Sequence, residues 1–476
     1  YNEIPDDYFS YSNVQSFTLP NTIKRIGKKA FLNGIFSSIT LPSSIEVIDE
    51  SAFSICKNLK EISIPNSVTS INKSAFASCV SLASIKLSES LTTIGESAFS
   101  GCKVLASIDI PTSVTFIGRL AFNRCDALTI VTIPENVEKI GGGAFAECAS
   151  LTGINVKDLS SWYKIDFSDN FTDVYTRYFA NPLYYARNMY VNGELLKSLE
   201  LPSTTTALND YAFYGCGSIE SVVIPNLITN IGDSTFASCI NLKKVTLNTN
   251  TVKPWFKNMG FIEELVLGNT VYTIEKNAFE GCNGLKSVHA APTLAIVGNN
   301  AFKGCTRLEG VWITDLSQWC TINWENEYAN PLYNAHRLYV DNSEVKDLVI
   351  PDDIEKLKRY AFAGGEGFTS VTIPESVRIM DRYAFLNCTN MKYVDMRDMA
   401  LWCTIQFDGS SNPLMYAHVL KLNGNVVSDL YVPETIEKIN DFAFYGCESI
   451  VFANIPNNIK EIGYTTFGEC TNLKNI

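Results

Sequence analysis

A pattern of hydrophobic and polar positions repeats along this chain at intervals of 23 residues. The stretch SAFSICKNLKEISIPNSVTSINKSAFASCVSLASIKL, residues 51–87, contains Ala-Phe twice, and each pair is followed three residues later by Cys. Aligned on the phenylalanine, the common unit is LxxIxIPxxVxxIGxxAFxxCxx, in which x is mostly polar. The key phenylalanines are Phe31, Phe53, Phe76, Phe99, Phe122, Phe145, Phe213, Phe236, Phe256, Phe279, Phe302, Phe362, Phe385, Phe444 and Phe467. This regularity predicts a stack of similar structural units.

Each unit contains the pattern of a strand, a corner and a turn. The IxI step alternates apolar and polar residues, which predicts a short strand, and the proline that often follows ends it. The residue after the next isoleucine is usually Gly, Asn or Asp, which tolerate positive φ, so we expect a fixed corner there. We interpret AFxxC as one helical turn with an inward-pointing phenylalanine. One unit cannot bury its own apolar face, but stacked units can.

The motif, seen in INKSAFASC and IGESAFSGC, resembles the BspA-like class of bacterial leucine-rich repeats over essentially the whole chain. The resemblance implies an α/β repeat solenoid, a right-handed curved coil with a parallel β-sheet on its concave side and short helical turns on its convex side. It also implies a cell-surface or secreted protein of a host-associated bacterium or protozoan that works in adhesion or protein binding. The family has no catalytic motif to transfer. We expect a single solenoid over residues 1–476.

Three longer coils interrupt the 23-residue interval, at about residues 157–200, 314–347 and 397–429. Each contains an Asp four residues before a Trp, then Asn-Pro-Leu. The Asp is a candidate helix N-cap, and the Trp one turn later faces the buried side. In the first and third inserts, Asn-Gly separates two strand-like runs, which is a strong hairpin signal. We therefore expect elaborated coils, each with an additional strand. A structural role is favoured for Trp162, Trp319, Trp324 and Trp402, with ligand binding as the alternative.

Charge and composition exclude several classes of partner. The chain is 46% hydrophobic and 18% charged, with a net charge of −12 and a pI near 4.9. This balance argues against nucleic acid and anionic lipid, because Lys and Arg neutralise phosphates. No run approaches 18 apolar residues, so we expect no membrane insertion in this segment. The chain ends partway into another repeat, and we interpret it as a piece of a longer protein.

Cysteine and histidine patterns do not predict catalysis, a metal or a cofactor. Twelve of the fourteen cysteines occupy the same slot of the repeat, which favours buried free thiols over disulfides or zinc. His336 and His418 share an insert position that is Arg187 in the first insert, which suggests capping or surface packing. No GxSxG, HExxH, P-loop or GxGxxG motif is present, so we expect no enzyme.

The middle residue of each IxI strand should point out of the concave face. This row is small and polar at first and becomes apolar and aromatic from Val223 onward. Exposed aromatic clusters favour binding hot spots. The candidate binding residues, which include neighbours one step earlier in two strands, are His289, Trp312, Val349, Tyr393, Tyr431 and Phe452. The alternative is that the inserts lie over the sheet and cover these side chains.

The leading hypothesis is a non-enzymatic cell-surface or secreted adhesion module that presents its concave face to a protein ligand, either a host protein or a bacterial surface protein. One alternative is a carbohydrate-binding solenoid, since aromatic residues on a curved sheet can support glycans. Another is a structural spacer that holds a different domain away from the cell. The sequence names neither the ligand nor the anchor.

Overall fold

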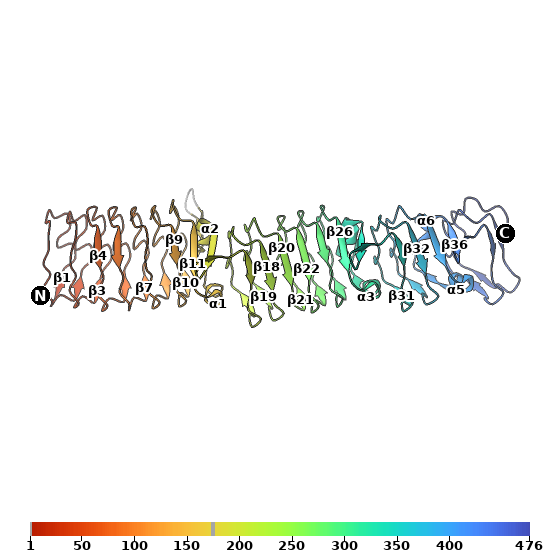
Figure 1. The fold of residues 1–476 in the computed structure, drawn as a ribbon, viewed down its shortest axis with the longest axis horizontal. Coiled ribbons are helices and arrows are strands. Elements are labelled where there is room, and N and C mark those ends of the chain that lie inside the picture. Colours follow the sequence, from red (N-terminus) through yellow and green to blue (C-terminus); the bar gives the residue numbers. More distant parts are fainter. Residues whose placement is uncertain (1, 173–176) are drawn as a thin grey trace. The chain divides into compact units, whose positions relative to one another are not determined.

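In a computed structural model of the chain, which describes residues 2–172 and 177–476, two compact units can be distinguished. The first consists of Tyr1–Val222 and Leu227–Leu242, and the second of Val223–Asn226 and Lys243–Ile476. Within each unit, strands of successive coils lie side by side and pair in parallel (Figure 1). The predicted parallel solenoid is therefore confirmed within each unit. The prediction of one solenoid over residues 1–476 stays a prediction.

The elements of the first unit are short. Its strands are β1 (Glu3–Ile4), β2 (Arg25–Ile26), β3 (Val47–Ile48), β4 (Glu61–Ser63), β5 (Ser70–Ile71), β6 (Ser84–Lys86), β7 (Thr93–Ile94), β8 (Phe116–Ile117), β9 (Ile130–Thr132), β10 (Lys139–Ile140), β11 (Gly153–Val156), β12 (Phe171–Thr172), β13 (Arg177–Tyr178), β14 (Asn188–Val191), β15 (Glu194–Leu195), β16 (Ser198–Glu200), β17 (Ala207–Leu208) and β19 (Asn230–Ile231). Its helices are α1 (Leu159–Trp162) and α2 (Leu183–Ala186). Strand β18 (Ser221–Ile224) contributes residues to both units.

The second unit has the same kinds of element. Its strands are β20 (Lys244–Leu247), β21 (Thr251–Val252), β22 (Glu264–Leu267), β23 (Thr273–Ile274), β24 (Ser287–His289), β25 (Ile296–Val297), β26 (Gly310–Ile313), β27 (Asn323–Trp324), β28 (Leu338–Val340), β29 (Ser343–Glu344), β30 (Asp347–Val349), β31 (Lys356–Leu357), β32 (Ser370–Ile373), β33 (Ile379–Met380), β34 (Tyr393–Met396), β35 (Gln406–Phe407), β36 (Leu420–Leu422), β37 (Asn425–Val426), β38 (Asp429–Tyr431), β39 (Lys438–Ile439), β40 (Phe452–Asn454) and β41 (Glu461–Ile462). Its helices are α3 (Leu316–Thr321), α4 (Leu332–Ala335), α5 (Met399–Thr404), α6 (Leu414–Ala417) and the 3-10 helix η1 (Glu327–Ala329).

Many coils contain two strands where the sequence predicts one. The first is the IxI strand, as in β4 and β6, whose central isoleucine is buried between exposed neighbours. The second is a two-residue strand just before the corner, as in β5 and β7, which pair in parallel. Two residues are too few to show a period of two, so the sequence pattern does not reveal the second strand.

The key phenylalanines stack in the core. In the first unit, Phe31, Phe53, Phe76, Phe99, Phe122 and Phe145 form an unbroken series of stacked rings with centroid separations of 5.1 to 5.5 Å. In the second unit, Phe279–Phe302, Phe362–Phe385 and Phe444–Phe467 stack in the same way. A stacked pair adds roughly 0.5–1.5 kcal/mol to the burial of the rings themselves. The predicted inward direction of these side chains is confirmed.

The AFxxC segment is a series of β-turns and not the predicted helical turn. Ala75, Ala77 and Cys79 each donate a backbone hydrogen bond to the residue three positions earlier. The backbone N–H groups between them donate to the next coil, as Phe76 does to the carbonyl oxygen of Ala98 at 2.8 Å. Ser74 and Ser78 have φ values of 54° and 60°, which interrupt a helix. The short helices lie in the inserts.

The corner glycines are needed for close approach rather than for positive φ. A Cβ atom on Gly95 would lie 2.7 Å from the carbonyl oxygen of Ile71 in the preceding coil. The positive φ of this corner belongs to Ser97, two residues later, with φ of 53°. The corner was predicted correctly, but its left-handed residue was placed two positions too early. Asp49 and Asn72 fill the glycine position elsewhere, and the Asn72 amide donates to the carbonyl oxygen of Ile48 at 2.9 Å.

The repeated cysteines are free, buried and hydrogen-bonded to the preceding coil. All fourteen are buried free thiols. In ten of them the thiol contacts the carbonyl oxygen of the key phenylalanine one coil earlier, as Cys79 does with Phe53 at 3.1 Å. The predicted buried thiols are confirmed, and they also link neighbouring coils. Burial raises the pKa of the Cys102 thiol to about 12, so it remains a protonated donor at neutral pH.

Candidate functional site

The middle residues of the IxI strands lie on an accessible face. Along β22 and β34 buried residues alternate with partly exposed ones, and in β26 only Trp312 is partly exposed; the expected row residues Val266, Trp312 and Asp395 are all partly exposed. The polar row residues of the first unit, such as Thr40 and Ser63, are exposed. The alternation follows from the pleat of a strand, which points successive side chains to opposite faces.

Two of the six candidate residues form a stack with a third aromatic residue from an insert. His289 on β24, Trp312 on β26 and Tyr339 on β28 occupy paired positions of adjacent parallel strands. The His289 and Trp312 rings have centroids 5.2 Å apart and an interplanar angle of 22°. The Trp312 and Tyr339 rings are 4.6 Å apart and tilted by only 6°. We call these three residues the aromatic stack.

Gly310 allows two rings of the aromatic stack to lie against the sheet. Gly310 begins β26, two residues before Trp312 and on the same face. A Cβ atom there would lie 2.6 Å from Cε2 of Tyr339 and 2.8 Å from Cη2 of Trp312. The two rings therefore lie over Gly310, and a side chain at this position would displace them. Gly153 and Tyr190 repeat this arrangement at the first insert, where the corresponding distance is 2.4 Å.

The geometry of the aromatic stack exposes ring edges and covers ring faces. Near-parallel rings on adjacent strands are in contact through their π faces, so the accessible part of Trp312 is ring edge, although Cη2 and Cζ3 of the same ring lie over Gly310. Partial burial lowers the pKa of His289, and Glu264, 3.8 Å away, only partly opposes this effect. This shift favours the neutral form of the His289 imidazole. Glu264 is paired with Lys244 at 2.8 Å.

The other four candidate residues do not join the aromatic stack. Val349, 52% exposed, lies on β30, and Tyr393 lies on β34 of the same sheet, where Lys421 Nζ is 3.5 Å from the centroid of its ring. Tyr431, 63% exposed, meets Phe452 edge to face at 6.2 Å in the sheet of β38 and β40. The six residues thus belong to three separate sheets.

The insert hairpins extend the sheet. Strands β14, β28 and β36 each pair in parallel with the preceding IxI strand, and each then turns into an antiparallel partner, β15, β29 or β37. The predicted Asn-Gly hairpins are confirmed, with φ values of 51° and 82° at Asn192 and Gly193. Because the hairpins add strands at the edge, the alternative in which they cover the aromatic residues is wrong for these strands. Each hairpin also ends a hydrogen-bonded sheet, so the row is divided into blocks.

Sequence reasoning missed Tyr339 because the row included only IxI strands. The hairpin strands supply one further row residue each: Tyr190 opposite Asn155, Tyr339 opposite Trp312, and Lys421 opposite Asp395. Aligning the three inserts on their hairpin turns would have placed Tyr339 two residues before the turn, on the same face as Trp312.

The insert tryptophans are structural. Asp158, Asp315 and Asp398 accept the predicted N-cap hydrogen bonds of α1, α3 and α5. The buried indoles of Trp162, Trp319 and Trp402 donate through Nε1 to the carbonyl oxygens of Ala212, Ala361 and Ala443, at 2.7 to 2.9 Å. These side chains are at most 2% exposed, so a ligand cannot reach them. The predicted staple role is confirmed.

The basic residue shared by the inserts is a helix cap. Arg187, His336 and His418 follow α2, α4 and α6 with positive φ. Nδ1 of His336 lies 2.9 Å from the carbonyl oxygen of Gly364, and His418 makes the same contact with Gly446 at 3.0 Å. The predicted capping role is confirmed. Within residues 2–172 and 177–476, no group of three or more His, Cys, Asp or Glu side chains could hold a metal ion.

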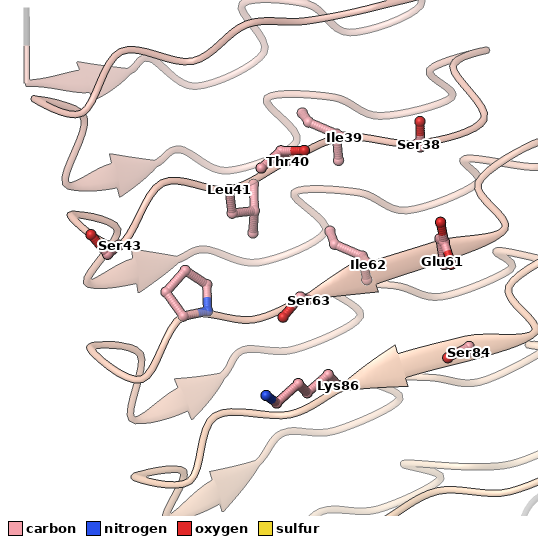
Figure 2. Close-up of a pocket in the computed structure, with 11 residues that line it drawn as sticks. Ser38, Ile39, Thr40, Leu41, Ser43, Glu61, Ile62, Ser63, Ser84 and Lys86 are labelled. Carbon is pink, nitrogen blue, oxygen red and sulfur yellow. The ribbon is translucent and has the colours of Figure 1, made fainter.

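A second candidate region is a polar pocket on the strand face of the first unit. Its volume is about 610 Å³. Figure 2 shows Ser38, Glu61 and Ser84 in one row across neighbouring coils and Thr40, Ser63 and Lys86 in the next. Five of its lining residues carry hydroxyl groups, which can both donate and accept hydrogen bonds, and the others are one carboxylate, one ammonium group and four apolar residues.

A comparison with known families identifies the repeat. The BspA type leucine rich repeat region matches the chain in six copies, over residues 2–125, 47–172, 186–254, 252–322, 337–403 and 423–476. The chain belongs to this family. Leucine-rich repeats of this kind are generally non-catalytic binding modules. No curated protein matches this BspA-type chain. None of the helices in the described part is long and apolar enough to cross a membrane.

Several solved structures similar to this BspA-type chain are bacterial leucine-rich repeat proteins. One from Bacteroides ovatus is 24% identical and covers 82% of this chain and 86% of that chain, with a TM-score of 0.38. A leucine rich cell surface protein from Faecalibacterium prausnitzii is 21% identical, with coverages of 78% and 91% and a TM-score of 0.29. The pneumococcal vaccine antigen PcpA is 18% identical, with coverages of 88% and 92% and a TM-score of 0.34. Similarities at these values support no statement about ligands.

Proposed function

We propose that this chain is a non-enzymatic adhesion module, secreted or at the cell surface, whose concave strand face binds a protein of a host or of a bacterial surface. The observation that supports this proposal is the aromatic stack of His289, Trp312 and Tyr339, held in register by three parallel strands. Rigid, partly exposed aromatic side chains provide contact area at little cost in conformational entropy. The Tyr431–Phe452 pair is proposed as a secondary contact.

The geometry of the aromatic stack favours a protein over a sugar at this place. A pyranose ring binds tryptophan through the open π face, and in the aromatic stack the two faces of Trp312 meet His289 and Tyr339. The exposed ring edges carry partial positive charge, which suits backbone carbonyls and the faces of other aromatic rings in a protein partner.

The test is surface plasmon resonance of the purified chain against a panel of immobilised extracellular-matrix proteins. For a matrix protein that the chain binds, Trp312→Ser and Tyr339→Ser should each weaken the affinity at least about thirtyfold, because hot-spot side chains contribute about 2 kcal/mol or more. Tyr272→Ser, which alters an exposed tyrosine of the second unit, is the matched control and should bind like the wild type. If both stack variants bind like Tyr272→Ser, the aromatic stack is not the site. If attachment to the matrix protein is also unchanged in Tyr393→Ser and Tyr431→Ser, the result would favour the alternative in which the chain is a structural spacer.

The polar pocket of the first unit supports carbohydrate binding as a second candidate function. Its rows of hydroxyl groups, with Glu61 as an acceptor and Lys86 as a donor, match the hydrogen-bonding groups of a glycan. A glycan array should then give saturable binding that Lys86→Ala and Glu61→Gln abolish and Trp312→Ser leaves unchanged. Glycan binding that instead depends on Trp312 would assign sugar recognition to the aromatic stack.

A further inference from the structure

A second aromatic surface lies at the AFxxC turns that follow the second insert, away from the IxI strands. Tyr360 and Tyr383 occupy the position before the alanine of the Ala-Phe pair in two successive coils. Their rings stack with centroids 5.4 Å apart and an interplanar angle of 21°. Many coils have a small residue at this position, for example Ser51, Ser74 and Ser97.

Both tyrosines have an uncommon backbone conformation. The φ values are 60° at Tyr360 and 66° at Tyr383, in the left-handed region that bulky side chains rarely adopt. Tyr360 is 5% exposed, so packing of its ring explains its presence. Tyr383 is one coil further from the insert and only half-buried, so packing accounts for it less completely. The same position has positive φ in other coils, as at Ser74 and Ser97, so the conformation belongs to the repeat and the two tyrosines are accommodated in it.

Two arginines lie over these rings. The guanidinium carbon of Arg359 is 4.8 Å from the Tyr360 centroid and 5.6 Å from the Tyr383 centroid. Arg382 lies 5.7 Å from the Tyr383 centroid. Arg359 Nη2 also donates to the Tyr360 hydroxyl at 3.1 Å. We call Arg359, Tyr360, Arg382 and Tyr383 the Arg-Tyr ladder. The contacts with the rings and the phenol fix the direction of the Arg359 guanidinium, and its other N–H groups remain available to a ligand.

The charges around the Arg-Tyr ladder leave Arg359 as the available cation. Asp381 is paired with Lys356 at 2.9 Å, and Asp408 lies 3.8 Å from Nε of Arg382. These two carboxylates and the two arginines line one pocket of about 340 Å³. Arg359 is exposed, and the polar partner described for its guanidinium is a neutral phenol.

We propose that the Arg-Tyr ladder is a second interaction surface, distinct from the aromatic stack, that binds a carboxylate side chain of an acidic segment in a partner protein. Arg359 forms a bidentate hydrogen-bonded ion pair with the carboxylate, and the tyrosine rings hold the guanidinium plane in place. Arginine and tyrosine are also the residue types enriched at protein interfaces, where Lys is depleted. This surface is independent of the function proposed for the strand face.

The experiment measures fluorescence anisotropy of labelled hexaglutamate with the whole chain at about 0.15 M ionic strength, where repulsion by distant carboxylates is screened within about 8 Å. The wild type should bind it, although the net charge of the chain is −12 and would by itself repel a polyanion. Arg359→Gln should weaken binding about tenfold, and Arg359→Lys should weaken it nearly as much, because an ammonium keeps the charge but loses the planar fork. Arg397→Gln is the matched control. Arg397 is also half-exposed and has a long ion pair, 3.7 Å to Asp352, and its loss should leave hexaglutamate binding unchanged.

Three results would overturn the proposal. The first is absence of hexaglutamate binding by the wild type. The second is an equal loss in Arg359→Gln and Arg397→Gln, which would show a general effect of charge. The third is binding of heparin with no binding of hexaglutamate, which would assign the Arg-Tyr ladder to sulfated polysaccharide. The Trp312-dependent binding should be the same in Arg359→Gln as in the wild type, so failure here is distinguishable from failure of the strand-face proposal.

Discussion

The carbonyl oxygen of the alanine before each key phenylalanine needs a hydrogen-bond donor from the coil before it. In a regular coil this oxygen accepts from the backbone N–H of the key phenylalanine one coil earlier, as Ala98 does from Phe76. An insert has no such phenylalanine at its end, and a buried carbonyl without a donor is costly. The indole of Trp319 and the amide of Asn330 replace the missing donor at Ala361, at 2.8 and 3.1 Å. This requirement explains why Trp and Asn recur in all three inserts.

Trp319 and Trp324 should respond differently to replacement by phenylalanine. Trp319→Phe removes one of the two donors to Ala361 and leaves the Asn330 amide, and we expect a loss of about 1–2 kcal/mol in the free energy of unfolding. Nε1 of Trp324 is buried and has no partner in the described part of the chain, and the equivalent residues of the other inserts are Phe167 and Phe407. Trp324→Phe should therefore change the stability by less than about 1 kcal/mol.

Urea unfolding followed by far-UV circular dichroism measures both variants without depending on the tryptophan signal. Equal losses of stability would contradict the role assigned to the Trp319 indole.

At the scale of elements, the strand that bears Trp312 depends on the absence of a side chain at Gly310. Gly310→Ala should destabilise the protein by roughly 1–3 kcal/mol, because the new Cβ atom overlaps the rings of Trp312 and Tyr339. The same substitution in a background that already carries Trp312→Ala and Tyr339→Ala should cost little, since alanine has no conformational disadvantage in a strand.

A double-mutant cycle on unfolding free energies tests this coupling between Gly310 and the two rings. Gly153→Ala, which meets Tyr190 in the same way in the first unit, provides the matched comparison. Additive effects of Gly310→Ala and the ring deletions would show that the rings do not lie over the glycine.

The sequence pattern was sufficient for elements that contain a full period and not for shorter ones. IxI strands, Asn-Gly hairpins and Asp N-caps were predicted because each depends on local preferences of a few residues. The two-residue strands were not, since two positions define no alternation. The division of the strand row into blocks was also missed, because an antiparallel hairpin strand ends a sheet through its pairing, which side-chain periodicity does not reveal. For the same reason Tyr339 was absent from the predicted site.

At the scale of the whole molecule, the buried thiols connect coil packing to pH. A thiol inside the repeat stays protonated to a higher pH than in the unfolded chain: burial raises the pKa of Cys102 and of Cys282 from an ordinary value near 9 to about 12. Between these values the unfolded state releases a proton that the folded state keeps. The stabilisation that depends on the protonated thiol is therefore complete below about pH 9 and is lost as pH rises toward 12.

Alkaline conditions should consequently destabilise this chain steeply. For each such thiol, the free energy of unfolding falls by about 1.4 kcal/mol per pH unit between the pKa of the thiol in the unfolded chain and its pKa in the folded chain. Exposed lysine ion pairs such as Lys438–Glu461 change stability in the same direction, because hydrogen bonding to Glu461 raises the pKa of Lys438. The double variant Cys102→Ala/Cys282→Ala separates the two causes. Its unfolding free energy is measured in urea from neutral pH to about pH 11. The fall with pH should be less steep than in the wild type, by a slope that corresponds to about two protons. A slope equal to that of the wild type would show that alkaline loss comes from the surface ion pairs and not from the thiols that link the coils.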